Sequence, residues 1–194
     1  MSPVDPQFPP RPTVLAQDLL RPVIRPGDVV IDATAGNGHD TVFLAECAGE
    51  AGRVLAFDVQ EAALVSARQR VESAGFAGRV EFIHESHAGM GNHAEAESVS
   101  VIMFNLGYLP GDGHDLTTQA DETLAALEVA AGLLAARGVL SVVCYPGHPA
   151  GAPEAEAVEA WMASQAASGW RVAKYGAIGT RRAAPFLLVA RKPD

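Results

Sequence analysis

The sequence predicts an α/β fold in which a mostly parallel sheet of seven strands carries helices on both faces. Short apolar runs, such as residues 29–31 and 99–104, are typical of strands that are buried on both faces. These runs alternate with segments of helical spacing, and such alternation requires right-handed crossovers between parallel strands. Only a loop separates residues 171–175 from residues 186–191, so we expect the last pairing to be antiparallel.

The pattern in the first half of the sequence predicts an extended segment, followed by a helix, two strand–helix units and a third strand. Five prolines in residues 1–12 favour an extended lead-in, so we expect the folded domain to span residues 13–194. Thr13 can cap a helix that runs through Leu20, and Pro26-Gly27 predicts the turn before the first strand. The other elements expected here are strands at 29–31, 53–57 and 80–83 and helices at 40–47 and 61–73.

The second half repeats the alternation and then changes to strands alone. A strand at 99–104 precedes a helix rich in Ala and Leu over 121–136, and we expect Gly138 to close that helix. The elements expected after it are a strand at 139–144, a helix at 153–168 and the two final strands.

Length and composition exclude several classes of protein. The chain has 194 residues, of which 48% are hydrophobic and 19% are charged, and this composition is typical of one globular domain. Cys47 and Cys144 are the only cysteines, which excludes a disulfide framework and a cysteine-based zinc site. The six histidines show no metal-ligand spacing, so we expect no metal. With no span of bilayer length and no signal peptide, the expected location is the cytoplasm.

Charge is distributed unevenly along the chain. The net charge is −9, yet residues 168–194 contain six basic residues and one acidic residue. An acidic body with a basic C-terminal segment leaves nucleic acid open as a local partner. The alternative is an ordinary strand pair with solvated lysines and arginines.

A glycine-rich loop follows the first predicted strand and opens onto a helix. Gly36 and Gly38 allow a sharp turn and a close approach of a ligand to the backbone. A dinucleotide-binding fingerprint would have a third glycine where this chain has Thr41, and Asp32 and Asp40 would repel a pyrophosphate. Two carboxylates instead suit a cationic ligand, and S-adenosylmethionine (SAM) carries both an ammonium and a sulfonium group.

Polar residues also follow the next two strands. Asp58 lies twenty residues after Gly38, which is the separation at which a carboxylate meets ribose hydroxyls in this topology, and Gln60 can add an amide contact. Ser86 and His87 follow the third strand, where an adenine would lie. Because ligands bind at the carboxyl ends of such strands, these residues predict one cofactor site along one edge of the sheet.

The fourth strand ends in the sequence from Phe104 to Pro110, which resembles the Asn-Pro-Pro-Tyr element of enzymes that methylate nitrogen. An amine attacks through its lone pair, so its N–H groups must be held while the lone pair faces the methyl carbon. The Asn105 oxygen and a backbone carbonyl at Leu106 or Gly107 can accept those hydrogen bonds, and Tyr108 can pack on the group that carries the amine. An ordinary strand followed by a glycine-containing turn is the alternative interpretation.

The fifth strand ends in a loop rich in proline and glycine that contains Tyr145 and His148. A histidine at this position suits substrate contact or proton acceptance, and a purely structural turn is an equal alternative. The amine must lose a proton before or just after attack. Tyr108, His148 or a water molecule can relay that proton.

The motifs together resemble one family of bacterial SAM-dependent methyltransferases, the tRNA 5-aminomethyl-2-thiouridine methyltransferases of the MnmM type, formerly grouped as rRNA methylases. The resemblance covers residues 13–192 and implies a Rossmann-like class I methyltransferase fold. It also implies methylation of the wobble-uridine amine by SAM, with S-adenosylhomocysteine as the second product. Thr34 stands where small-molecule methyltransferases have their first glycine, as in the family, and Ala184-Pro185 replaces an expected doubled proline. The cofactor roles that the resemblance implies fall on Asn37, Asp40, Asp58, Gln60, Ser86 and His87.

The expected reaction is an in-line displacement at the methyl carbon by a neutral amine, with no covalent intermediate. The expected partner is the tRNA anticodon arm, with Arg181 and Arg182 on phosphates, Tyr108 or Tyr145 against the flipped base and Pro185 in the same loop. We expect a monomer or a homodimer. The alternatives are methylation of rRNA or of a small-molecule amine, a non-catalytic SAM-binding module, and a nicotinamide-dependent oxidoreductase.

Overall fold

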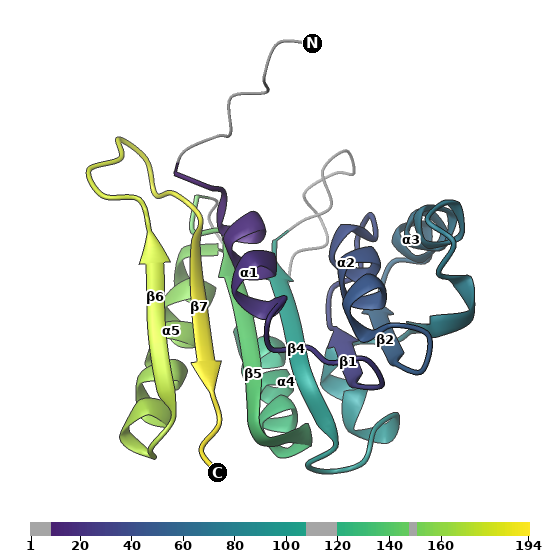
Figure 1. Cartoon of the computed structure of the whole chain (residues 1–194). Coiled ribbons are helices and arrows are strands. Elements are labelled where there is room, and N and C mark those ends of the chain that lie inside the picture. Colours follow the sequence, from purple (N-terminus) through teal and green to yellow (C-terminus); the bar gives the residue numbers. More distant parts are fainter. Residues whose placement is uncertain (1–8, 108–119, 148–150) are drawn as a thin grey trace.

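The computed structural model describes residues 9–107, 120–147 and 151–194, which form a seven-stranded sheet with helices on both faces (Figure 1). The strands lie in the order β3-β2-β1-β4-β5-β7-β6. Strands β1 to β5 pair in parallel, whereas β7 runs antiparallel to both β5 and β6. The predicted α/β class, the mostly parallel sheet and the antiparallel end are therefore confirmed.

The elements follow the predicted order closely. The strands are β1 (Val29–Asp32), β2 (Arg53–Asp58), β3 (Val80–His84), β4 (Val99–Leu106), β5 (Leu134–Cys144), β6 (Arg171–Gly176) and β7 (Phe186–Arg191). The helices are α1 (Pro12–Leu20), α2 (His39–Ala48), α3 (Glu61–Ser73), α4 (Ala120–Leu133) and α5 (Gly151–Ala167), with short 3-10 helices η1 (Ala77–Arg79) and η2 (His87–Asn92).

Two apolar layers hold the helices against the sheet. Helices α1, α2 and α3 cover one face, and α4 and α5 cover the other (Figure 1). On the first face Leu20 and Leu44 pack in one cluster with Val101, and on the second Leu127 packs in another with Leu140. All of these side chains are fully buried, and each contributes roughly 1.5–3 kcal/mol of burial free energy. None of the described helices is long and apolar enough to cross a bilayer.

The first helix begins differently from the prediction. Its N-cap is Arg11, and Pro12 occupies the first helical turn, so Thr13 lies inside the helix and does not cap it. Proline suits this position because its φ is already helical and it has no N–H to leave unpaired. The predicted cap at Thr13 is therefore wrong, although the helix itself is confirmed.

The boundary between α4 and β5 also differs from the prediction. The helix ends at Leu133, and β5 begins at Leu134, which is paired with Val99 of β4. Lys192 Nζ donates hydrogen bonds to the carbonyl oxygens of Leu134 at 2.7 Å and Ala131 at 3.1 Å, so it takes up carbonyls that the helix leaves free at its end. The prediction that Gly138 closes the helix is wrong, because Gly138 lies within β5.

Candidate active site

The carboxyl ends of the parallel strands bring the predicted polar residues to one edge of the sheet. Asp32 ends β1, Asp58 ends β2, and Asn105 is the penultimate residue of β4. The strand order reverses between β1 and β4, and ligands of open α/β sheets bind at such a reversal. Tyr108 and His148 lie outside the described residues, so their predicted roles stay predictions.

Asp32 is buried at the start of the glycine-rich loop. Its side chain is 1% exposed, and it accepts hydrogen bonds from Thr41 Oγ1 at 2.6 Å and from the Thr34 N–H at 3.2 Å. Burial, followed by the nearby carboxylate of Asp40, raises the pKa of Asp32 to about 7. Thr41, at the position of the absent third glycine, therefore ties α2 to the end of β1.

The loop itself is fixed by its glycines and by Asp58. Gly36 and Gly38 have φ values of +49° and +78°, in the left-handed region that favours glycine. A Cβ on Gly38 would lie 2.7 Å from the Cα of Ala67, so α3 leaves no room for a side chain there. Asp58 accepts hydrogen bonds at 2.9 Å from the N–H groups of both Gly36 and Gln60, which joins the loop to the end of β2.

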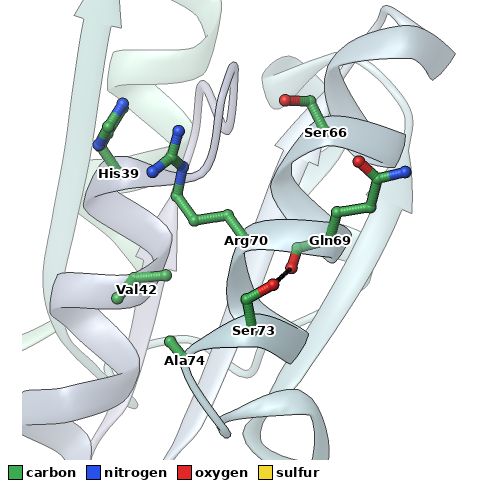
Figure 2. A pocket seen from close by; sticks show the side chains of 7 residues that line it. All are labelled: His39, Val42, Ser66, Gln69, Arg70, Ser73 and Ala74. Carbon is green, nitrogen blue, oxygen red and sulfur yellow. Dashed lines mark hydrogen bonds between the residues drawn. The ribbon is translucent and has the colours of Figure 1, made fainter.

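Asn37 is held by α3 and lies next to a cleft that is distinct from the strand ends. Ser66 Oγ donates to Asn37 Oδ1 at 3.1 Å, and Arg70 Nε donates to its carbonyl oxygen at 2.6 Å. The cleft, of about 570 Å³, is lined by residues of α2, α3 and the residue that follows α3, including His39 and Gln69 (Figure 2). Because no strand-end residue lines it, we do not assign the cofactor to this cleft.

Ser86 is the N-cap of η2, and His87 is the first residue of this helix. Ser86 Oγ accepts from the N–H of Ala88 at 3.2 Å and donates to Glu122 of α4. His87 is buried, its Nδ1 lies 3.2 Å from the carbonyl oxygen of Ala33, and its Nε2 is buried with no partner among the described residues. Burial lowers the pKa of His87, which favours the neutral ring. Because a carbonyl only accepts, Nδ1 carries the proton and Nε2 is left as a buried acceptor for a ligand donor.

Asn105 is oriented by Thr34 and Asp40, and Gln17 holds Asp40 in turn. Its backbone N–H donates to Thr34 Oγ1 at 2.7 Å, and its side-chain Nδ2 donates to Asp40 Oδ2. The other oxygen of Asp40 accepts from Gln17 Nε2 of α1 at 2.6 Å. Asn105 Oδ1 is buried and has no partner among the described residues. At the carboxyl edge of β4 the amide therefore keeps an acceptor that is not used within the described part of the chain.

The predicted substrate residues surround the ends of β4 and β5. Leu106 is buried, and a Cβ on Gly107 would lie 3.4 Å from Cδ2 of Tyr145. Burial raises the pKa of Tyr145, and the Asp40 carboxylate raises it further. Tyr145 therefore lies within electrostatic reach of the carboxylate that orients Asn105.

The loop between β6 and β7 reaches the end of β5, as the topology predicts. A Cβ on Gly147 would lie 3.2 Å from the carbonyl oxygen of Ala183, and this loop stands at the same end of the sheet as the end of β4 (Figure 1). Arg181, Arg182 and Pro185 are all exposed.

Sequence reasoning missed two residues of this site. Gln17 reaches Asp40 across 23 positions of sequence, and Glu122 reaches Ser86 across 36. Neither contact has a local sequence signal, because each depends on how a helix docks on the sheet. Among the described residues, no group of three or more His, Cys, Asp or Glu is arranged to hold a metal ion.

The fold and the strand-end site define a class, the Rossmann-like SAM-dependent methyltransferases. Within that class the chain belongs to the rRNA methylase family, whose model, described as "Putative rRNA methylase", matches residues 54–191.

Individual relatives agree with this assignment. The chain is 36% identical, over 94% of its length and 69% of the relative's, to an Arabidopsis thaliana protein called "tRNA (mnm(5)s(2)U34)-methyltransferase, chloroplastic". It resembles the crystal structure of a "putative rRNA-methylase" from Clostridium thermocellum, with a TM-score of 0.90, 33% identity and coverage of 94% and 97% of the two chains. A "putative methyltransferase" from Streptococcus mutans in complex with SAH is similar with a TM-score of 0.84, 32% identity and coverage of 94% and 98%.

Proposed function

We propose that the chain methylates the aminomethyl nitrogen of 5-aminomethyl-2-thiouridine at the wobble position of tRNA, giving 5-methylaminomethyl-2-thiouridine. The observation that carries this proposal is the buried Oδ1 of Asn105, which has no partner among the residues that the structure describes and is an acceptor suited to an amine N–H. The name of the Arabidopsis relative supports the choice of nucleoside. One catalytic domain over residues 13–194, acting in the cytoplasm, completes the proposal.

The residues at the strand ends fit SAM, which supplies an electrophilic methyl group on a sulfonium. Nε2 of His87, to which no described residue donates, is a buried acceptor of the kind that an adenine amino group requires. Asp58 has acceptor capacity beyond its two backbone hydrogen bonds, which suits ribose hydroxyls. The proposed cofactor set lies around the glycine loop and the next two strand ends and consists of Asp32, Thr34, Gly36, Asn37, Gly38, Asp58, Gln60, Ser86 and His87. Asp40, which the sequence also placed in this set, accepts hydrogen bonds from Asn105 and Gln17.

Catalysis by this chain rests on positioning and on the exclusion of water. Asn105 Oδ1 accepts one amine N–H, so the nitrogen lone pair is directed away from the asparagine. Tyr145, which is half-buried beside Gly107, offers an apolar face to the group that carries the amine. Tyr108 and His148 remain our candidates for accepting the proton that the amine releases, with water as the alternative.

RNA carries negative phosphates, so an RNA substrate must approach a basic surface. Residues 168–194 are basic, whereas the remainder of the chain is acidic. Arg181 and Arg182 are exposed on the loop between β6 and β7, in which Ala183 lies against Gly147 of the segment that follows β5. We assign these two side chains to phosphates of the anticodon arm, with Tyr145 against the flipped base.

The direct test is methyl transfer by the purified chain to tRNA that lacks this modification, with rRNA and a free aminomethyl nucleoside as parallel substrates. We expect methylation of tRNA alone, with the product identified by mass spectrometry of the digested nucleosides. Methylation of rRNA or of the free nucleoside with inert tRNA would overturn the proposal. SAM binding without transfer to any substrate would identify a non-catalytic module.

A further inference from the structure

Three side chains from three elements form a continuous hydrogen-bonded chain beside the proposed amine site. Gln17 of α1 donates to one oxygen of Asp40 of α2, at 2.6 Å from Nε2 to Oδ1, and Asn105 of β4 donates to the other oxygen. Asp40 is 7% exposed, so water competes little for its oxygens. This hydrogen-bonded series therefore connects helix α1, which covers one face of the sheet, to Asn105, the residue proposed to bind the amine.

An ionised carboxylate only accepts hydrogen bonds, so it determines which end of each neighbouring amide faces it. Both Gln17 and Asn105 must present their NH2 groups to Asp40. The Asn105 oxygen is then turned away from Asp40, and this is the buried atom that has no partner among the described residues. A buried acceptor left unpaired costs free energy, so this arrangement needs a compensating ligand.

We propose that Gln17 and Asp40 are positioning residues that orient the Asn105 amide, so that its oxygen rather than its NH2 faces the acceptor amine. This inference rests on the proposed function and assigns Asp40 to Asn105 instead of to the cofactor.

Gln17 supports this arrangement by stabilising the charged form of Asp40. Burial raises the pKa of Asp40, and the hydrogen bonds from Gln17 and Asn105 oppose that effect. A protonated Asp40 would become a donor and would allow the Asn105 amide to turn around. Helix α1 is held for this purpose by Ala16 and Leu20, which are fully buried against the sheet.

The test compares Gln17→Glu, Asp40→Asn and the double variant with the parent. The double variant exchanges the carboxylate and the amide between positions 17 and 40. Gln17→Glu sets two carboxylates against each other, and Asp40→Asn leaves the amide at position 40 free to face either way. In the double variant the NH2 at position 40 faces the new carboxylate, and its oxygen again accepts from Asn105. We expect each single variant to lower kcat by about tenfold or more and the double variant to recover to within about threefold of the parent.

Two further readouts separate positioning from other roles. We expect the SAM dissociation constant of all three variants to stay within about threefold of the parent, and the thermal unfolding of the free proteins to show the same rescue. Gln69→Glu adds the same charge on the exposed face of α3 and should leave kcat unchanged. The inference is wrong if the kcat of the double variant does not exceed that of the more active single variant. It is also wrong if the variants lose activity because they bind SAM more weakly. A parent without tRNA methylation, or a fully active Asn105→Ala variant, would overturn the proposed function itself, whereas the unfolding cycle would still test the hydrogen-bonded chain.

Discussion

The Asp58→Ala variant tests the cofactor assignment, because the Asp58 side chain connects the glycine loop to the end of β2 and is proposed to bind the ribose of SAM. The substitution removes two hydrogen bonds of 2.9 Å to backbone N–H groups, those of Gly36 and Gln60. A hydrogen bond to a charged group contributes about 1.5–3 kcal/mol. Because Asp58 is only half-buried, water can replace part of both hydrogen bonds, so we expect their joint loss to lower the free energy of unfolding by about 2–3 kcal/mol.

The effect on SAM binding should be larger than on folding. The variant also loses the acceptor for the ribose hydroxyls and loosens the loop, which together cost about 2–4 kcal/mol and weaken SAM binding by about 30-fold to 900-fold. Titration calorimetry with SAM, and with NAD as the competing ligand, measures this directly. Asp28→Ala is the matched control, because Asp28 accepts one hydrogen bond at 2.9 Å, from Arg25 N–H, at the opposite end of β1. Unchanged SAM affinity in Asp58→Ala, or tight NAD binding by the parent without SAM binding, would refute the reasoning.

Three other predictions follow from the site. Asn105→Ala should keep SAM affinity and lower turnover by about a hundredfold, measured by single-turnover methyl transfer, and a normal rate would remove Asn105 from the chemistry. Arg181→Ala with Arg182→Ala should flatten the log–log salt dependence of tRNA binding by about one unit for each phosphate that the variant no longer neutralises, and a slope equal to that of the parent would make these side chains a solvated edge. Burial raises the pKa of Asp32 to about 7, above its unfolded value of about 4. The free energy of unfolding of the parent therefore falls as pH rises from about 4 to about 7, because the buried carboxyl group must lose its proton there. Asp32→Asn should therefore gain stability relative to the parent, by up to about 4 kcal/mol between pH 4 and pH 7.5 in urea titrations, and a relative loss would contradict the sign.

The bounds of helices and strands could be predicted where turn-forming residues such as glycine and proline flank them. Residues 61–73 and 186–191 have the predicted bounds, since turns or glycines flank apolar patterns of one clear period. The end of α4 could not be predicted, because Ala135 and Ala136 favour a helix while pairing of Leu134 with Val99 requires a strand. Tertiary pairing overrides local propensity there.

The candidate site was predictable where it depends on topology alone. Parallel strands place Asp32, Asp58 and Asn105 at one edge whatever the helices do. The partners of these residues were not predictable, because Gln17 and Glu122 reach the site only through the docking of α1 and α4. Sequence patterns therefore identify the strand-end residues, whereas the orientation of each side chain requires the packed structure.

The central claim is that this chain methylates the wobble-uridine amine of tRNA. Mass spectrometry of tRNA nucleosides from cells with and without the gene tests it most directly. The account predicts that 5-methylaminomethyl-2-thiouridine disappears without the gene, that 5-aminomethyl-2-thiouridine accumulates in its place, and that the parent gene restores the methylated nucleoside while the Asn105→Ala variant does not. Unchanged levels of both nucleosides in cells without the gene would contradict it.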